Sequence, residues 1–323
     1  WGMIGCGAVT EKKSGPALQQ ASGSQLLAVF GRTVEKARDY AHRHRVPRVY
    51  SDVESLLQDP DIDAIYIATP PDSHLEYALR VADAGKICCV EKPMALNAQQ
   101  CQIMVAAFAV KNLPLFVSYY RRSLPRFLQI KTWLDESCIG HVRHVQWNYY
   151  RPPTEIDRSQ RFHWRTQPQI AGGGYFMDLG CHGIDLLQFL LGDIAHASGF
   201  TARQQHLYPA EDAVTACWQF ASGATGGGFW NFAAQKRVDE VIIIGSAGEI
   251  RFSVFLEQPV LLENAHERIA LDIPHPDPIQ LHHVTNIVRH LNAEQLHPST
   301  GPSALRTAEV MDAILGRGSI QAS

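Results

Sequence analysis

An aspartate and a histidine stand four residues apart in the stretch GGGYFMDLGCHGID, which covers residues 172–185. They are Asp178 and His182, and Asp185 follows three residues later. An imidazole takes up or releases a proton near neutral pH, and a carboxylate can orient such a ring or a substrate. The same spacing also places the three side chains on one face of a helix. Two interpretations therefore stand side by side: a solvated helix face, or the proton-transfer part of an active site.

A second group of interest lies at the start of the chain, in GMIGCGAVT. Gly5 and Gly7 directly follow an apolar run, and Ala8 and Val9 open the next segment. Glycines at this place permit a tight turn and let the backbone approach a pyrophosphate, which a helix N-terminus then stabilises. The third position of the G-x-G-x-x-G pattern is Thr10. The turn predicts a dinucleotide site, and an ordinary strand–helix turn is the alternative.

The end of the second apolar run bears on the type of dinucleotide, because it carries Gly31, Arg32 and Thr33. A site that prefers NAD usually has Asp or Glu at this place, where the carboxylate bonds the ribose 2′-hydroxyl. A carboxylate would repel the 2′-phosphate of NADP, whereas a guanidinium pairs with it. The sequence therefore favours NADP(H). NAD(H) is the alternative if Arg32 is solvated and Thr33 only caps the next helix.

Lys92 lies just after the apolar run ICCV, with Glu91 between them. Ligands bind at the carboxyl ends of the strands of a parallel sheet, so this position suits a site. Hydride transfer at a carbinol carbon needs one group that stabilises an alkoxide-like oxygen and another that moves its proton. Lys92 and His182 are of these two types. A solvated lysine at a strand end is the competing interpretation.

These side chains need a scaffold, and the first 118 residues alternate strand and helix signals. Continuous apolar runs occur at 1–5, 26–30, 64–68, 87–90 and 115–117. Such runs are typical of strands that are buried on both faces of a parallel sheet. We predict an α/β protein whose residues 1–118 form a dinucleotide-binding Rossmann domain with a doubly wound parallel sheet.

The pattern changes after about residue 118. Strands are predicted at 142–150, 213–220, 227–233, 241–245 and 249–255, and several are separated only by glycine-containing turns. Helices are predicted around 122–136, 175–191, 279–293 and 302–315. We expect residues 119–323 to form a substrate-binding α+β domain with a large, mostly antiparallel open sheet. The last helix, about 302–315, is expected to be able to pack back toward the first domain.

Composition limits the class of protein. The 323 residues carry a net charge of −3, which argues against a nucleic-acid binder, and no apolar stretch reaches the ~18 residues that a membrane helix needs. Seven scattered cysteines show neither disulfide nor zinc-binding spacing, and the chain opens on an apolar strand signal rather than a secretory leader. His282 and His283 are expected to decorate a C-terminal helix rather than to bind a metal. We therefore expect a cytoplasmic protein without a metal, nucleic-acid or membrane site.

Five segments occur in an order that points to a known family: GCGAV, ATPPDSH (68–74), EKPMA (91–95), WRTQP (164–168) and GGGYFMDLGCHGID. Over essentially its whole length, the sequence resembles the glucose–fructose oxidoreductase / inositol dehydrogenase / MocA family of NAD(P)-dependent oxidoreductases. The resemblance implies a second domain whose open sheet packs in a homodimer or homotetramer. It also implies a dehydrogenase or reductase that acts on CH–OH groups of a small sugar-like, cyclitol or related hydroxy or carbonyl substrate.

The resemblance further implies residue roles. Lys92 matches a catalytic, substrate-orienting lysine, while Asp178 and His182 match a catalytic pair in which His182 transfers the proton. Together with the residues discussed above, the expected cofactor contacts are Gly5, Gly7, Ala8, Val9, Arg32, Thr33, Thr69, Pro70, His74, Glu91, Lys92, Trp164 and Arg165. Two positions depart from the family pattern: Thr10 at the third glycine, and Tyr120 where many members have Asn.

Two other functions remain open at this point. Some members of the superfamily hold NAD tightly for a transient oxidation that ends in hydrolysis or elimination, with no net redox change. Other relatives are non-catalytic nucleotide sensors or regulators on the same fold. A regulator would be expected to lose the lysine and the histidine, so the presence of Lys92 and His182 argues against the regulator.

Overall fold

The computed structural model of the protein describes residues 1–318 and 320. The chain forms two compact units. The first comprises residues 1–95, 99–124 and 276–305, and the second comprises residues 96–98, 125–275 and the described residues from 306 onward. The predicted boundary at residue 118 would place residues 276–305 in the second domain, whereas they belong to the first unit. The helix predicted around 279–293 is present as Leu281–Leu291, but it belongs to the first unit, which local sequence patterns do not reveal.

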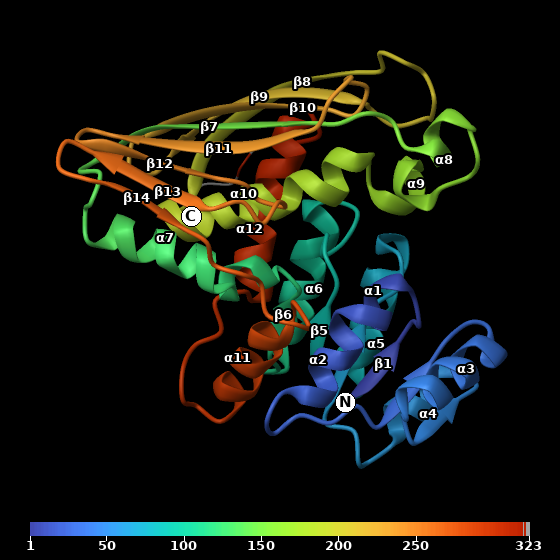
Figure 1. Cartoon of the computed structure of the whole chain (residues 1–323). Helices are drawn as coiled ribbons and strands as arrows, with labels where there is room; N and C mark the ends of the chain where they lie inside the picture. Colours follow the sequence, from blue (N-terminus) through green and yellow to red (C-terminus); the bar gives the residue numbers. More distant parts are fainter. Residues whose placement is uncertain (319, 321–323) are drawn as a thin grey trace. The chain divides into compact units, whose positions relative to one another are not determined.

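The first unit is built on a six-stranded sheet in the order β3-β2-β1-β4-β5-β6 (Figure 1). All five strand pairs are parallel, so the predicted doubly wound Rossmann sheet is confirmed. Its strands are β1 (Gly2–Ile4), β2 (Ala28–Phe30), β3 (Arg48–Tyr50), β4 (Ala64–Ile67), β5 (Ile87–Val90) and β6 (Leu115–Val117). Its helices are α1 (Ala8–Lys12), α2 (Ser14–Gln20), α3 (Val34–His44), α4 (Val53–Gln58), η1 (Pro71–Ser73), α5 (His74–Asp83), α6 (Ala98–Val110), η2 (Tyr120–Ser123) and α11 (Leu281–Leu291).

Helix α11 completes the core of this unit. Val284 and Ile287 are fully buried in one cluster with Met3 of β1, Val29 of β2 and Tyr66 of β4. Burying an aliphatic side chain of this size contributes roughly 1.5–3 kcal/mol. The helix is therefore a structural part of the dinucleotide-binding fold, although it follows residues 125–275 of the second unit in the sequence.

Two buried histidines make the stability of this unit sensitive to acid. His283 is 1 % exposed and His297 is 4 % exposed, so His283 lies in the core rather than decorating its helix as predicted. Burial lowers the pKa of His283 well below its usual value and lowers the pKa of His297 to about 4. The rings lie edge to face with centroids 4.7 Å apart, and the His297 Nδ1 atom accepts a hydrogen bond from the Ser299 amide (2.9 Å).

We expect the free energy of unfolding to fall as the pH is lowered from about 6.5 to about 4. Unfolded histidines take up protons near pH 6.5, whereas the folded rings resist protonation, so acid favours the unfolded chain. The contribution of His297 alone is about 3 kcal/mol. Melting temperatures measured across this range should show a shallower pH dependence for His297→Gln than for the wild type. The exposed His266→Gln serves as the control, and equal slopes for His297→Gln and the wild type would contradict the assignment.

The second unit contains an eight-stranded sheet in the order β14-β13-β12-β11-β7-β10-β9-β8. Only the β7–β10 pair is parallel, so the predicted large, mostly antiparallel sheet is confirmed. Its strands are β7 (Val142–Tyr150), β8 (Ile194–Ala202), β9 (Ala213–Phe220), β10 (Thr225–Asn231), β11 (Val238–Gly245), β12 (Gly248–Phe252), β13 (Val260–Asn264) and β14 (Arg268–Leu271). Its helices are α7 (Pro125–Asp135), α8 (Glu155–Arg158), η3 (Trp164–Thr166), α9 (Pro168–Ala171), the π-helical turn η4 (Phe176–Gly180) and α10 (Cys181–Leu191). Helix α12 (Gly301–Ile314) crosses the division between the units at residue 305.

Helices α7 and α10 lie on one face of this sheet, and the other face is open in the part of the chain that is described (Figure 1). Trp147 of β7 and Trp230 of β10 are fully buried on the covered face, with ring centroids 5.1 Å apart. Gly183 of α10 lies directly over Trp147, because a Cβ at this position would overlap the indole ring. This close approach fixes the position of the helix that carries His182.

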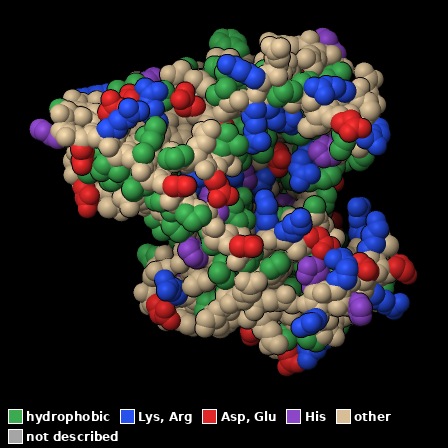
Figure 2. Space-filling view, in the orientation of Figure 1, with side chains coloured by type: hydrophobic (Ala, Val, Ile, Leu, Met, Phe, Trp, Pro, Cys, Tyr) green, Lys and Arg blue, Asp and Glu red, His purple; other side chains and the backbone are tan. Residues whose placement is uncertain are grey.

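The face of the molecule shown in Figure 2 carries charged side chains of both signs. Lysine and arginine side chains are interspersed with aspartate and glutamate over the face shown in Figure 2. Among the described residues, no helix combines the length and the apolar character needed to cross a membrane.

Candidate functional site

A pocket of about 220 Å³ opens at the carboxyl ends of β1, β2 and β4 in the first unit. It is lined by Ile4, Gly5, Cys6, Gly7, Phe30, Gly31, Arg32, Thr33, Lys36, Ala37, Ala68, Thr69, Pro70 and Tyr77. The structure thus brings together six of the residues that we predicted to contact the cofactor: Gly5, Gly7, Arg32, Thr33, Thr69 and Pro70. Ala8 and Val9 begin α1 directly after this turn and do not line the pocket.

The glycine turn has the geometry that a cradle for phosphate groups requires. Gly5 has a φ of +101°, and a Cβ there would lie 3.0 Å from the carbonyl carbon and oxygen of Ala68. Only glycine satisfies both conditions without strain. A Cβ at Gly7 would meet no atom within 4 Å, so the outer side of that backbone is open. The turn therefore fits a pyrophosphate that approaches the backbone closely.

The far end of the same pocket is positively charged. Arg32 and Lys36 line it, and none of its lining residues is an aspartate or a glutamate. Thr33 stands at the N-cap of α3, but its side chain makes no capping hydrogen bond. Sequence reasoning missed Lys36 and Tyr77. The lysine had a usable signal, because it lies in the first turn of the helix that directly follows Arg32 and Thr33.

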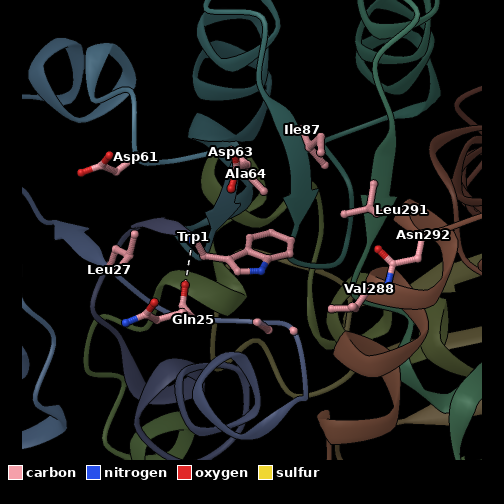
Figure 3. A pocket seen from close by; sticks show the side chains of 12 residues that line it. Trp1, Gln25, Leu27, Asp61, Asp63, Ala64, Ile87, Val288, Leu291 and Asn292 are labelled. Atoms are coloured by element: carbon pink, nitrogen blue, oxygen red, sulfur yellow. Dashed lines mark hydrogen bonds between the residues drawn. The ribbon is translucent and has the colours of Figure 1, made fainter.

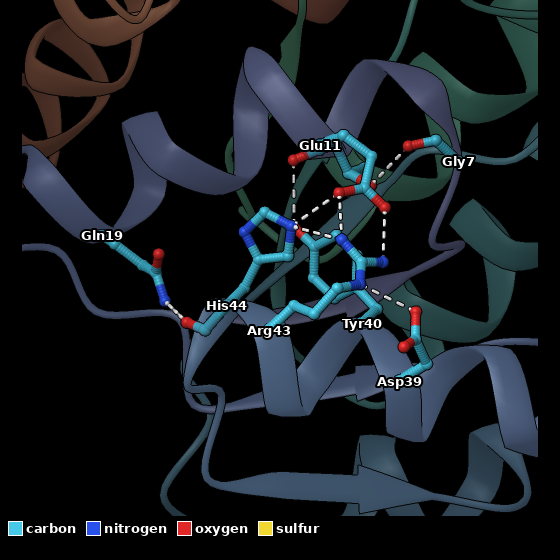
Figure 4. Close-up of polar contacts among 8 residues, drawn as sticks. Gly7, Glu11, Gln19, Asp39, Tyr40, Arg43 and His44 are labelled. Carbon is cyan, nitrogen blue, oxygen red and sulfur yellow. Dashed lines mark hydrogen bonds and ion pairs between the residues drawn. The ribbon is translucent and has the colours of Figure 1, made fainter.

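Helices α1 and α3 are tied together next to the glycine turn (Figure 4). The hydroxyl of Thr10 donates to the Gly7 carbonyl (2.8 Å), and the Tyr40 hydroxyl donates to the Thr10 carbonyl (3.0 Å). Arg43 donates to both carboxylate oxygens of Glu11, at 2.7 and 2.8 Å. The threonine at the third glycine position is thus accommodated by hydrogen bonding. These contacts hold the turn against the helix that carries Lys36.

His74 was predicted as a cofactor contact, and the structure shows it fully buried between two loops. Its Nε2 atom lies 2.8 Å from the Thr69 carbonyl oxygen, and its Nδ1 atom lies 3.1 Å and 3.2 Å from those of Pro93 and Met94. Burial lowers its pKa, and the three carbonyl groups oppose this effect. Both ring nitrogens therefore contact protein backbone, and the ring connects the loop after β4 to the loop after β5.

Lys92 follows β5 at the carboxyl edge of the sheet, and the Lys92–Pro93 peptide bond is cis. Its neighbour Tyr120 follows β6, the strand next to β5. Burial raises the pKa of Tyr120, but the charges of Arg121, Lys13 and Lys92 outweigh it and hold the pKa below its usual value. The Nζ atom of Lys13 also lies 5.8 Å from the Tyr120 ring centroid. The carboxyl edge of β5 and β6 is therefore a positively charged region around a tyrosine.

In the second unit, Asp178 and His182 do not lie on one regular helix. Asp178 belongs to the π-helical turn η4, and α10 begins only at Cys181. In a π turn the hydrogen bonds run from i to i+5, so the α-helical spacing assumed from sequence does not apply at Asp178. Such turns occur often at functional sites.

The solvated-face interpretation of this segment is wrong. His182 is 4 % exposed and Asp185 is fully buried. The His182 ring lies 5.9 Å from the ring of Phe255, and the Thr307 hydroxyl donates to Asp185 Oδ1 (3.2 Å). The idea that Asp185 orients the imidazole of His182 stays a prediction.

The structure brings together three further predicted residues in the second unit. The Arg165 Nε atom lies 3.2 Å from Asp178 Oδ2, and the Arg165 guanidinium lies 4.3 Å from the centroid of the Trp164 ring. Asp178 is therefore held by an ion pair whose cation stacks on an indole. The sequence placed Trp164 and Arg165 near a cofactor, but it gave no indication of this ion pair.

Tyr175 and His163 lie near this ion pair, and neither was predicted as a site residue. The Tyr175 hydroxyl donates to Asp157 (2.7 Å) and lies 3.3 Å from His163 Nδ1. Burial and the Arg165 charge lower the pKa of His163, whereas the Asp157 and Asp178 carboxylates raise it. Tyr175 is part of the predicted GGGYF segment, but periodicity alone does not distinguish a tyrosine of the core from one that joins a polar cluster.

Another cavity, of about 530 Å³, lies at the opposite ends of the strands in the first unit (Figure 3). Its lining includes Trp1 before β1, Ala64 at the start of β4 and Ile87 at the start of β5, together with Val288 and Leu291 of α11. None of the predicted site residues lines it. Among the described residues, no group of histidine, cysteine, aspartate and glutamate side chains could hold a metal ion.

Comparison with known proteins agrees with this geometry. Residues 1–119 match the GFO/IDH/MocA oxidoreductase family with an NAD-binding Rossmann fold, and residues 127–251 match the GFO/IDH/MocA C-terminal domain. The chain is 36 % identical over 323 residues to an oxidoreductase from Formosa agariphila, with 98 % of each chain covered. It is 25 % identical to trans-1,2-dihydrobenzene-1,2-diol dehydrogenase of Xenopus laevis, over 78 % of this chain and 74 % of the relative.

Among solved structures, levoglucosan dehydrogenase in complex with NADH and levoglucosan is similar with a TM-score of 0.86. The two are 24 % identical, and the match covers 98 % of this chain and 95 % of that one. At this identity the likeness concerns the fold. The family matches and the relative at 36 % identity together show that the chain belongs to the Gfo/Idh/MocA family of NAD(P)-dependent oxidoreductases.

Proposed function

We propose that the protein transfers a hydride between NADP(H) and a CH–OH group, or its carbonyl counterpart, of a sugar-like or cyclic polyol. The observation that supports this most strongly is the pocket at the glycine turn, where Gly5 and Gly7 leave room for a pyrophosphate and Arg32 and Lys36 face the other end. The names of the relatives, which include a diol dehydrogenase, support the substrate class.

The preference for NADP(H) over NAD(H) is argued from charge. The 2′-phosphate of NADP carries negative charge that two cations can pair with, and a pocket without carboxylates does not repel it. The 2′-hydroxyl of NAD would instead need an acceptor such as a carboxylate at the end of β2. Glu91, Trp164 and Arg165 keep their proposed places near the nicotinamide end.

The nicotinamide cofactor supplies the hydride chemistry when it is bound. We assign to Lys92 the stabilisation of negative charge on the substrate oxygen, because an ammonium at a sheet edge is a strong electrostatic donor. His182 takes the hydroxyl proton in oxidation and returns it in reduction. Asp178, held by Arg165, orients the substrate hydroxyl groups.

The test is a panel of sugars, cyclitols and diols, with their carbonyl counterparts, followed by the absorbance of the reduced cofactor. We expect turnover with at least one polyol and a higher kcat/KM with NADP(H) than with NAD(H). A protein that binds neither cofactor in calorimetry would contradict the proposal. Turnover of substrate with tightly retained cofactor and no net change in its absorbance would instead indicate redox-neutral chemistry.

We also propose that the open face of the eight-stranded sheet joins subunits in a homodimer or homotetramer. Large apolar side chains on three of its strands are exposed, namely Phe200 of β8, Phe229 of β10 and Ile244 of β11. Exposed apolar groups gathered on one face are typical of subunit interfaces. A cytoplasmic location stays a prediction.

A further inference from the structure

The carboxylate of Glu91 is buried in the first unit, directly before Lys92, and is 6 % exposed. Its Oε1 atom accepts hydrogen bonds from the Tyr66 hydroxyl (2.6 Å) and from Gln280 Nε2 (3.1 Å). Its Oε2 atom accepts a hydrogen bond from the backbone amide of Lys92 (3.2 Å). One oxygen is therefore held by the core, and the other holds the main chain of the proposed catalytic lysine.

The groups around Glu91 come from separate elements. Tyr66 lies in β4, Ser118 follows β6, and Gln280 directly precedes α11. A tyrosine has one hydroxyl proton. Since that of Tyr66 goes to Glu91, the Ser118 hydroxyl, at 2.9 Å, donates to Tyr66. Burial and the charge of Glu91 raise the pKa of Tyr66 well above its usual value, so the phenol stays a donor.

Gln280 is a member of this network that local sequence patterns do not reveal. It is fully buried, and its amide touches both Glu91 and Tyr66, with Oε1 at 3.1 Å from the Tyr66 hydroxyl oxygen. Gln280 reaches the Glu91 carboxylate because residues 276–305 return to the first unit. A glutamine at this place therefore connects the helix that closes the core to the carboxyl edge of the sheet.

A buried carboxylate is costly unless donors satisfy it, and apolar side chains fill a core at lower cost. The network is thus an expensive way to hold the fold together. Its effect on geometry is specific, because the Glu91 side chain links the core to one backbone amide, that of Lys92. A fixed amide limits the directions in which the Lys92 side chain can leave the sheet edge.

We propose that Gln280 is a positioning residue for Lys92 and acts through Glu91. Together with Tyr66, it clamps the carboxylate, and the carboxylate fixes the backbone from which the lysine ammonium reaches the substrate oxygen. The proposal rests on the proposed function, because the direction of Lys92 matters only if Lys92 takes part in the reaction.

The effect of a new charge placed beside Glu91 depends on the titratable groups that already face its carboxylate. They are Tyr66 of β4, Cys89 of β5, His74 of α5, Tyr120 of η2 and Lys92 itself. None of these neighbours is a carboxylic acid. A carboxyl group introduced at position 280 would therefore bring a like charge within hydrogen-bonding distance of Glu91, where the wild type has an amide donor.

The test uses two substitutions in the full-length protein. Gln280→Met keeps the size of the side chain but removes the donor, and we expect kcat to fall about 10- to 100-fold with little change in the KM for NADPH. Gln280→Glu places a second carboxyl group beside Glu91. Two adjacent carboxyl groups share a proton in acid and repel each other once both are ionised. The kcat of Gln280→Glu should approach the wild-type value at acid pH and fall below it at alkaline pH.

Thr285→Val is the matched control, because Thr285 lies further along α11 and its hydroxyl donates to the Leu281 carbonyl of the same helix (2.9 Å). It should keep the wild-type kcat and pH profile. A purely structural role for Gln280 predicts lower melting temperatures for both Gln280 variants with an unchanged kcat and pH profile. That result would overturn the proposal. If Gln280→Met does not fold, Tyr66→Phe removes the other donor and keeps the ring.

A second readout separates this proposal from the proposed function. Reductive methylation of Lys92, quantified by peptide mass spectrometry, does not depend on turnover. We expect the ratio of Lys92 to Lys111 modification to change several-fold in Gln280→Met, since the environment of Lys92 changes and the exposed Lys111 does not. An unchanged ratio would overturn the positioning role. If the wild-type protein turns over no substrate while Gln280→Met still shows the changed ratio, only the proposed function is overturned.

Discussion

Replacing Lys92 with Met should lower kcat by about 10²–10⁴-fold while leaving the affinity for NADPH nearly unchanged. Methionine keeps most of the aliphatic stem and removes the charge that stabilises the developing oxyanion. His182→Gln should cause a loss of similar size, because glutamine can still form hydrogen bonds but cannot carry the proton. Stopped-flow or steady-state kinetics with the best substrate of the panel, together with calorimetric titration of NADPH, would measure both effects.

Lys111→Met and His266→Gln are the matched controls, since both residues are exposed and neither belongs to the proposed site. They should behave like the wild type. If either site variant keeps the wild-type turnover, the role given to that residue is wrong. A loss of NADPH binding in Lys92→Met would assign the lysine to cofactor binding instead of catalysis.

Removing the guanidinium of Arg32 should weaken NADPH binding about 10- to 100-fold and leave NADH binding almost unchanged. Arg32 and Lys36 are the two cations that line the pocket, and only the 2′-phosphate of NADP presents them with a charge to pair with. Arg32→Asp should go further, because a carboxylate repels that phosphate and accepts a hydrogen bond from the 2′-hydroxyl of NAD. The measurement is the ratio of kcat/KM values for the two cofactors.

Arg38→Ala is the control for this experiment, since Arg38 lies on α3, the helix that begins two residues after Arg32, and does not line the pocket. Its cofactor ratio should equal that of the wild type. If Arg32→Ala weakens NADH and NADPH binding equally, the guanidinium does not distinguish the 2′-phosphate of NADP from the 2′-hydroxyl of NAD. The protein would then be indifferent to the type of cofactor, or another group would discriminate.

Much of the fold could be predicted from sequence because local patterns determine it. The apolar runs that became β4, β5 and β6 are buried on both faces, and such strands leave a continuous signal. Strand β3 was missed because its three residues, Arg48–Tyr50, are only partly buried and include an arginine. Strand β8 was missed because most of Ile194–Ala202 is exposed or half-buried, so its sequence lacks a clear alternation.

The candidate site could be predicted only in part, for a related reason. The glycine turn and Arg32 are local features whose chemistry follows from their place after a strand. The π turn at Asp178 could not be foreseen, because composition does not distinguish a hydrogen bond to i+5 from one to i+4. Gln280 could not be foreseen either, since its contacts with Glu91 and Tyr66 join residues that are 189 and 214 positions apart.

The divided first unit also bears on how the protein is made. Its six strands are synthesised first, but α11, which supplies Val284 and Ile287 to their core, is synthesised only after residues 125–275 of the second unit. Domains generally fold in the order of synthesis, from the N-terminus. In this protein, the part of the sheet's apolar surface that α11 covers stays exposed until α11 has been synthesised. Gln280 arrives with that helix, so Glu91 acquires its amide partner only after residues 125–275 of the second unit have been synthesised.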